Sequence, residues 1–175
     1  TGKLPNELKA WLRKDLANNP RNLEGIPGLQ TSIGDTGCSA ICKQHESDFN
    51  EGTYELLKHT KQIGGIAGGL QVIGMGKVTF EFVTTKGEAI KITRDALHVP
   101  DLPADLTPPQ KLMRNSKEGW FNINGEQAVL KFANGKKVAC PFDPVTGLPL
   151  IHSCKKVDEA AEALEAALYL CVMAE

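Results

Sequence analysis

The chain has 175 residues, of which 41% are hydrophobic and 23% are charged, and its formal net charge is −1. This length is enough for one domain with a substantial core. A net charge close to zero argues against a dedicated nucleic-acid-binding protein, which usually carries a basic face, and no apolar run approaches the length of a membrane span.

The cysteine content and the N-terminal residues bear on the compartment. Five cysteines at irregular spacing do not favour a disulfide framework, and they indicate a reducing compartment. The first residues, Thr1-Gly2-Lys3, lack the pattern of a secretory signal. We therefore expect an intracellular chain that is part of a longer polyprotein.

Residues 4–17 are predicted to form an amphipathic helix. Its apolar residues recur at helical spacing and fall on one face: Leu8, Trp11, Leu12 and Leu16. Pro5 suits the first turn, and Asn18-Asn19-Pro20 ends the helix. Residues 19–28 contain several structure breakers and are interpreted as a linker. Residues 1–28 thus form an N-terminal helical extension and linker, which we expect to dock on the domain that follows.

Residues 29–33 are predicted to form the strand that delivers Asp35, which opens the sequence Asp35-Thr36-Gly37-Cys38-Ser39. Gly37 would allow a sharp turn with a positive φ. The hydroxyl groups of Thr36 and Ser39 are expected to bond to nearby backbone and to hold the loop. The sequence predicts a carboxylate at the tip of a rigid loop, and the alternative is an ordinary Asx-type surface turn.

A metal site near this loop is a second possibility. Cys38, Cys42 and His45 have the spacing C-x3-C-x2-H, but tetrahedral zinc needs a fourth ligand. The remaining candidates are far along the chain and form no second ligand pair: Cys140, His152 and Cys154. We therefore expect no metal, and we expect Cys38 to pack as a small apolar side chain behind the Asp35 loop.

Residues 62–78 contain a glycine-rich stretch between two apolar runs. This pattern predicts two strands joined by a tip that can open and close. Residues 78–84 and 89–93 then alternate between apolar and polar, and Lys86-Gly87 between them predicts a hairpin. Residues 107–113 are predicted to form a short helix capped by Thr107.

Residues 114–175 are expected to form a C-terminal β-meander and a helix. Strands are predicted at residues 120–123, 128–132 and 138–142, because Asn124-Gly125 and Asn134-Gly135 are strong hairpin signals. This meander is expected to extend the sheet of the preceding core. Ser153 is expected to cap a helix over residues 155–174, whose apolar stripe either faces the core or contacts another subunit.

Three elements occur in an order that resembles a known family: Asp35-Thr36-Gly37-Cys38-Ser39, the glycine-rich residues 63–69, and Leu97-His98-Val99-Pro100-Asp101-Leu102-Pro103. The glycine-rich stretch resembles the flap hairpin of retroviral aspartic proteases. The whole set resembles the protease region of copia-type LTR retrotransposon Gag-Pol polyproteins, over about half of the chain, residues 29–112. Two departures stand out: Gly34 occupies a position that is usually bulky and apolar, and Asp105-Leu106-Thr107 stands where the family has an Asn/Arg-Leu-Leu-Ser motif.

The resemblance implies a fold and an assembly. The fold would be mostly β with flanking helices, with a retropepsin-like closed antiparallel β-barrel over residues 29–113 and a glycine-rich flap hairpin. Two close carboxylates share one proton and serve as base and acid in peptide hydrolysis. The chain has one Asp-Thr-Gly or Asp-Ser-Gly sequence, so a working enzyme needs a homodimer with Asp35 of each subunit on a two-fold axis.

The resemblance also assigns residue roles. Asp35 would be catalytic and Thr36, Gly37 and Ser39 would support its loop. The flap that binds an extended peptide as an added strand would comprise Ile63, Gly64, Gly65, Ile66, Ala67, Gly68 and Gly69. Apolar subsites are expected at Ile33, Ile63, Ile66 and Val72.

The resemblance further implies a substrate and a compartment. The protein would be an aspartic endopeptidase that cuts the element's own polyprotein in the cytoplasm, including inside virus-like particles, and that works best at mildly acidic pH. It would need no cofactor, nucleic acid or membrane.

Two other functions remain open from the residues. One is a non-catalytic module of the same fold that serves for dimerisation or peptide binding, and a cleavage assay separates it from the protease. The other is a glycine-rich phosphate-binding loop, but residues 64–76 lack its Gly-Lys-Ser/Thr ending.

Overall fold

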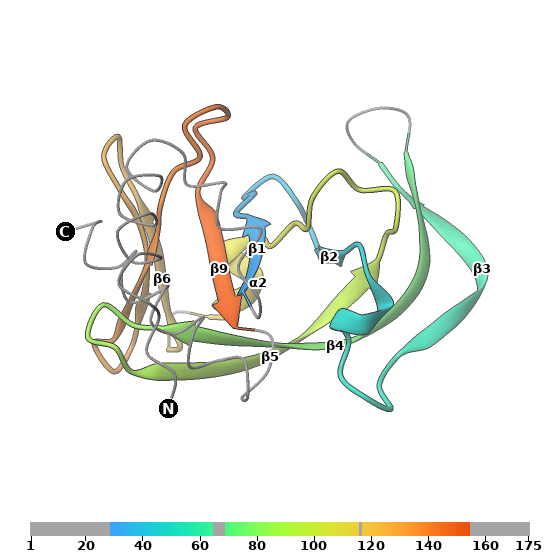
Figure 1. Ribbon diagram of the computed structural model, residues 1–175, viewed down its shortest axis with the longest axis horizontal. Coiled ribbons are helices and arrows are strands. Elements are labelled where there is room, and N and C mark those ends of the chain that lie inside the picture. Colours follow the sequence, from blue (N-terminus) through green and yellow to red (C-terminus); the bar gives the residue numbers. More distant parts are fainter. Residues whose placement is uncertain (1–28, 65–68, 116, 155–175) are drawn as a thin grey trace, which may run out of the picture.

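The computed structural model describes residues 29–64, 69–115 and 117–154, which form nine strands and two short helices (Figure 1). The elements are β1 (Leu29–Ile33), β2 (Ile41–Lys43), the 3-10 helix η2 (Glu46–Asp48), β3 (Glu55–Ile63), β4 (Leu70–Val83), β5 (Ala89–His98), α2 (Pro109–Leu112), β6 (Gly119–Ile123), β7 (Ala128–Phe132), β8 (Lys137–Cys140) and β9 (Leu150–Cys154). The fold is mostly β, as expected. The two helices predicted for residues 4–17 and 155–174 lie outside the described residues.

A six-stranded sheet is organised around the long strand β4. Its strand order is β1-β9-β4-β5-β2, and β3 also pairs with β4. The predicted hairpin over residues 78–93 is confirmed, and both strands are longer than expected, with pairing from Gly74↔His98 to Val83↔Ala89. Alternation places Val78, Phe80 and Phe82 on one buried face of β4, which explains why this stretch forms a strand.

The strands do not close into the expected barrel. Strands β1 and β2 stand at opposite ends of the strand order, and Leu106 makes only single-residue bridges to Ile33 in β1 and to Cys42 in β2. Pro103 and Pro108 flank this segment, and proline cannot donate a hydrogen bond to a ladder. A full strand between β1 and β2 is therefore prevented by the sequence itself.

The predicted three-stranded meander is confirmed, but it forms a sheet of its own with the order β6-β7-β8. The side chain of Asn124 accepts bonds from the amides of Glu126 and Gln127, and Gly135 has a φ of +85°. These turns explain the hairpins. The expectation that the meander extends the first sheet is wrong: within the described residues, no strand of the meander pairs with that sheet.

Ser153, the residue predicted to cap the last helix, lies in strand β9. It is buried there, and β9 pairs with β1 from Leu29↔Cys154 to Ile33↔Leu150. The partner strand lies about 120 residues earlier in the chain, so local sequence could not reveal this pairing.

The short helix α2 is where it was expected, but its cap differs. The N-cap residue is Pro108, with no side-chain cap. Thr107 instead accepts a hydrogen bond from the buried hydroxyl of Ser32 at 2.8 Å, and its amide donates to the carbonyl of Ile33. Thr107 thus fastens the segment before α2 to the strand that leads to Asp35.

The buried apolar side chains of the described residues form two clusters. The larger cluster joins the two sheets and includes Phe80 and Phe82 from β4, Leu130 from β7, Leu112 from α2 and Ile151 from β9. The smaller cluster consists of Cys42, Val72, Val99 and Leu102. Among the described residues, no helix has the length and apolar character needed to cross a membrane.

A buried histidine makes stability depend on pH. The Nδ1 of His152 in β9 lies 2.8 Å from the hydroxyl of Thr31, while the buried Nε2 has no hydrogen-bond partner among the described residues. Burial lowers the pKa of His152 to about 4. The unfolded chain takes up this proton near pH 6.5, so the stabilisation is full above that pH and is lost as the pH falls towards 4.

We expect the free energy of unfolding to fall by about 3 kcal/mol between pH 7 and pH 4 through His152 alone. Urea denaturation at several pH values measures this fall, and His152→Gln, which cannot titrate, is the control. The variant should show a shallower fall, and equal slopes for both proteins would contradict the assignment.

Candidate active site

Asp35 sits in a tight turn directly after β1. Its Oδ1 accepts a hydrogen bond from the amide of Gly37 at 2.8 Å, and its carbonyl accepts one from the amide of Cys38 at 3.2 Å. Asp35 is half-buried, whereas Thr36, Gly37 and Ser39 are exposed. The four predicted residues therefore lie together in one surface turn, and a backbone amide holds the half-buried carboxylate of Asp35.

The reason for glycine at position 37 differs from the expected one. Gly37 is not among the glycines with a positive φ. A Cβ at this position would lie 3.2 Å from Oδ1 of Asp35, closer than most real contacts. Glycine thus suits this position because a Cβ would crowd the carboxylate that folds back onto the amide of residue 37, and not because the backbone takes a special conformation.

The loop is held from outside by a residue that the sequence did not indicate. The Nε2 of Gln110, in α2, donates to the carbonyl of Thr36 at 2.9 Å and to the carbonyl of Cys38 at 3.1 Å. The hydroxyls of Thr36 and Ser39 form no hydrogen bond with any other residue that the structure describes, so their expected role in holding the loop is wrong. No motif could have pointed to Gln110, since it lies more than 70 residues from the loop it binds.

Gly34 is explained by packing against the segment before β9. Its amide donates to the carbonyl of Pro149 at 2.7 Å. A Cβ at position 34 would lie 3.1 Å from both the Cγ and the carbonyl oxygen of Pro149, and 3.4 Å from Cδ1 of Ile151. A bulky apolar residue would not fit here, because the backbone before the Asp35 loop packs closely against Pro149 and Ile151.

Residues 105–107 fix the strand that carries Asp35. The amide of Ile33 donates to the carbonyl of Asp105, and the amide of Thr107 donates to the carbonyl of Ile33, both at 2.9 Å. The carboxylate of Asp105 is buried and accepts bonds from the ammonium of Lys43 at 3.0 Å and from the amide of Gln44 at 2.9 Å. Sequence patterns do not reveal this buried ion pair, because its partners are 62 residues apart.

The glycine-rich hairpin is formed by β3 and β4, with the register Ile63↔Leu70 at its upper end. Gly64 is exposed, and Gly69 has a φ of +89° that favours glycine. The predicted flap residues Gly65, Ile66, Ala67 and Gly68 lie outside the described residues. The described part of the flap is therefore its two strands and the residues at either side of the tip.

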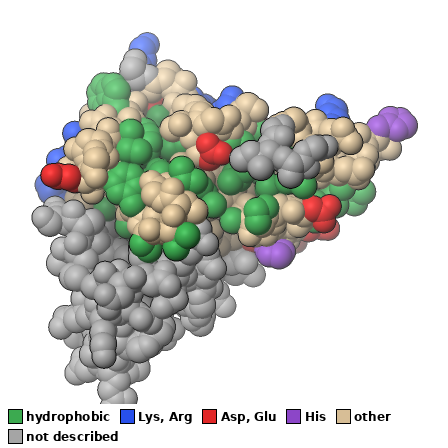
Figure 2. Space-filling view, turned by 90° about the horizontal axis from the view of Figure 1, so that it is seen from above, with side chains coloured by type: hydrophobic (Ala, Val, Ile, Leu, Met, Phe, Trp, Pro, Cys, Tyr) green, Lys and Arg blue, Asp and Glu red, His purple; other side chains and the backbone are tan. Residues whose placement is uncertain are grey.

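One apolar cluster lies beneath both the Asp35 loop and the base of the flap. Cys38 and Ala40 from the loop, and Ile63 and Leu70 from the flap, are partly buried against the smaller core cluster. Figure 2 looks onto the end of the molecule where this loop lies in Figure 1, and it shows hydrophobic side chains gathered across that face. Ile33 and Ile63 are half-buried, as subsite residues could be, whereas Val72 is only 2% exposed and is part of the core.

Two cysteines of this region lie in apolar surroundings. Cys38 packs on the smaller core cluster, as expected, and its Sγ donates to the carbonyl of Ala40 at 3.0 Å. Burial, followed by the neighbouring Cys38 and Asp105, raises the pKa of Cys42 to about 12. His45, the third residue of the C-x3-C-x2-H spacing considered as a zinc site, is exposed. Among the described residues, no group of three or more His, Cys, Asp or Glu side chains is placed to hold a metal ion.

Comparison of the sequence with family models and with curated proteins found no match. What this site can do therefore follows from its geometry and from the residues themselves. The site has a half-buried carboxylate in a surface turn, with exposed small residues around it. The same apolar cluster lies beneath this turn and the glycine-rich hairpin.

Proposed function

We propose that this chain is the subunit of a homodimeric aspartic endopeptidase of the retropepsin type. The observation that carries the proposal is that the Asp35 loop and the base of the flap pack on one apolar cluster, with Asp35 held by the amide of Gly37. This is the arrangement needed to bind an extended, partly apolar peptide over a carboxylate.

The chemistry requires a second copy of the chain. One carboxylate takes the proton of the attacking water, and the other, protonated, supports the carbonyl oxygen and the leaving nitrogen. The described residues bring no other carboxylate into the Asp35 loop, so the second one would be Asp35 of a partner. Within the described part of the chain the exposed hydroxyl of Thr36 makes no hydrogen bond, and it would bond to the partner loop on the two-fold axis.

The flap would supply the substrate's backbone contacts. An extended peptide can pair with the edge of a hairpin as an added strand, and glycines at the tip permit opening and closing. By the sequence resemblance, the substrate would be the chain's own retroelement polyprotein, and the compartment would be the cytoplasm or a virus-like particle. No cofactor is needed for this reaction.

A test combines stoichiometry with cleavage. A peptide carrying a non-hydrolysable hydroxyl in place of the scissile bond mimics the tetrahedral transition state. Calorimetry should give about one such inhibitor for every two chains, because one site is built by two subunits. In parallel, polyprotein fragments should be cut faster at pH 5 than at pH 7, with sedimentation showing a dimer.

The other outcomes distinguish the remaining functions. A dimer that binds the peptide but cuts nothing at either pH would favour the peptide-binding module. One inhibitor for each single chain, or cleavage by a monomer, would contradict a site shared across a two-fold axis.

Gln110 provides a more specific prediction for the same assay. Gln110→Ala removes both hydrogen bonds to the loop, and misplacement of Asp35 should lower kcat by a factor of up to roughly 100. Stability should change little because Gln110 is exposed. The matched control is Lys111→Ala, a change at the neighbouring exposed residue. Equal losses of kcat in the two variants would show that the hydrogen bonds of Gln110 do not position the loop.

A further inference from the structure

The turn between β8 and β9, residues 143–149, exposes two large aliphatic side chains. Val145 is 80% exposed and Leu148 is 39% exposed. The other exposed large hydrophobic side chains of the described residues lie on two different parts of the molecule, the β3–β4 hairpin and strand β6: Leu56, Met75, Trp120 and Ile123.

This turn is held in one shape by a buried carboxylate. Asp143 is 0% exposed, and its side chain accepts bonds from the amide of Val145 at 3.2 Å and from the hydroxyl of Thr146 at 2.7 Å. Its backbone amide donates to the carbonyl of Leu148, and its carbonyl accepts from the amide of Gly147, both at 2.8 Å. The aliphatic side chains are therefore presented by a preorganised turn, which lowers the entropy cost of binding.

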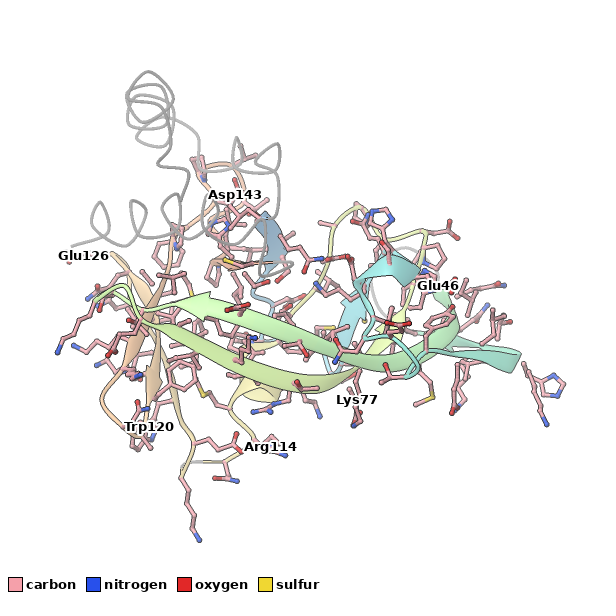
Figure 3. The ribbon with its side chains drawn as sticks, turned by 60° about the horizontal axis from the view of Figure 1, so that its bottom comes forward. Glu46, Lys77, Arg114, Trp120, Glu126 and Asp143 are labelled. Atoms are coloured by element: carbon pink, nitrogen blue, oxygen red, sulfur yellow. The ribbon has the colours of Figure 1, made fainter. Side chains whose placement is uncertain are left out.

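The turn lies next to the catalytic loop. Pro149, which follows Leu148, accepts the hydrogen bond from the amide of Gly34, the residue before Asp35. Figure 1 shows the turn rising above the start of β9, on the same side of the molecule as the loop that follows β1. In Figure 3, Asp143 lies on one side of the long β4–β5 ribbon and Trp120 lies on the other.

The proposed dimer needs an apolar surface at this place. If two Asp35 carboxylates meet on a two-fold axis, residues beside Asp35 are close to the axis as well. A stable interface buries about 800 Å² on each partner, and the exposed residues of the loop, Thr36, Gly37 and Ser39, are too small and polar to supply it. Among the described residues, the adjacent turn carries two exposed aliphatic side chains, Val145 and Leu148.

We propose that residues 143–149 form a dimerisation element, with Val145 and Leu148 packing on a second copy of this chain beside the paired Asp35 loops. This inference rests on the proposed function, because the approach of two Asp35 residues is what places the turn near the axis. In this proposal, part of the dimer interface is a turn whose shape is already fixed by the hydrogen bonds of Asp143.

The test measures association and catalysis separately. Val145→Asp and Leu148→Asp would place charges near the two-fold axis, opposite their own copies or the partner's turn. Sedimentation equilibrium should show that the dimer Kd rises roughly tenfold or more in each variant. Ile123→Asp, an exposed aliphatic residue of β6 changed in the same way, is the control and should keep the wild-type Kd. Milder Val145→Ser and Leu148→Ser variants, with circular dichroism of each protein, guard against loss of the fold.

Activity must follow association. At low protein concentration the turn variants should cut slowly, and raising the protein concentration should restore the wild-type kcat per dimer. A wild-type Kd in the turn variants, or an equal rise in Ile123→Asp, would overturn the assignment. In either case a wild-type dimer that cuts peptide would leave the proposed function standing. Wild-type protein that stays monomeric and inactive would overturn both.

Discussion

Asp35→Asn is expected to lower peptide cleavage by a factor of about 10²–10⁴ while the fold and the dimer persist. The amide side chain has nearly the same shape as the carboxylate, and its oxygen can still accept the bond from the amide of Gly37. The lost property is the ability to take a proton from water. The measurement is kcat/KM at pH 5 together with thermal unfolding and sedimentation of both proteins.

A mixing experiment makes this prediction specific for a shared site. When subunits exchange in an equimolar mixture of wild type and Asp35→Asn, half of the wild-type chains pair with a variant chain. If both carboxylates are needed, the activity per wild-type chain should fall to about half, and further as the variant is added in excess. An enzyme that worked with one Asp35 per site would show no such fall, because its mixed dimers would also cut and the activity per wild-type chain would rise.

The result would also separate the two functions that share this fold. A peptide-binding module would bind the transition-state mimic in both proteins and would show no cleavage to lose. Cleavage that survives in Asp35→Asn at the wild-type rate would mean that another group activates the water, and the proposed role of Asp35 would be wrong.

The elements that the sequence predicted well are those coded by neighbouring residues. Alternation identified the hairpin of β4 and β5, and the Asn-Gly pairs identified the turns of the meander. The Asp35 loop was found because its residues are consecutive. The β3–β4 hairpin was found because a glycine-rich stretch lies between two apolar runs.

The missed features depend on contacts between distant parts of the chain. Gln110 reaches the loop across more than 70 residues, and β9 pairs with β1 across about 120. Neither contact leaves a periodic pattern. Ser153 has the chemistry of a helix cap, yet pairing with β1 and burial decide that it lies in a strand.

Glycine was the residue type most easily misread. A positive φ was the expected reason for Gly37, and Gly34 stood out because the resembling family usually has a bulky apolar residue there. In the structure, a Cβ would be crowded at both positions, by Oδ1 of Asp35 in one case and by Pro149 in the other. A steric requirement of this kind becomes visible only when the neighbouring segment is in place.

Asp105→Ala is expected to destabilise the protein by about 3–5 kcal/mol, the largest stability change we predict. The side chains of Lys43 and Asp105 are 2% and 9% exposed, and their charged atoms lie 3.0 Å apart. The ammonium of Lys43 also lies 5.3 Å from the centre of the Phe80 ring. Without Asp105, a buried cation would lose its counter-charge, and the amide of Gln44 would lose its acceptor.

Two controls separate the causes of this loss. The pair Lys77–Asp95 has similar geometry, at 2.8 Å, but its side chains are 56% and 80% exposed, and Lys77 is labelled on β4 in Figure 3. Asp95→Ala should therefore leave stability nearly unchanged. The double variant Lys43→Met with Asp105→Leu removes both charges and should recover most of the lost stability, because the desolvation cost disappears with the pair.

The same variants connect stability to the Asp35 loop. Asp105 holds Ile33 through its backbone carbonyl, which Asp105→Ala retains, so a folded fraction of the variant should still place Asp35 correctly. Urea denaturation should therefore show the full loss of stability, while kcat per folded dimer, measured well below the unfolding temperature, should stay close to wild type. A loss of kcat in Asp105→Ala that the double variant shares, despite regained stability, would mean that the ion pair itself shapes the site.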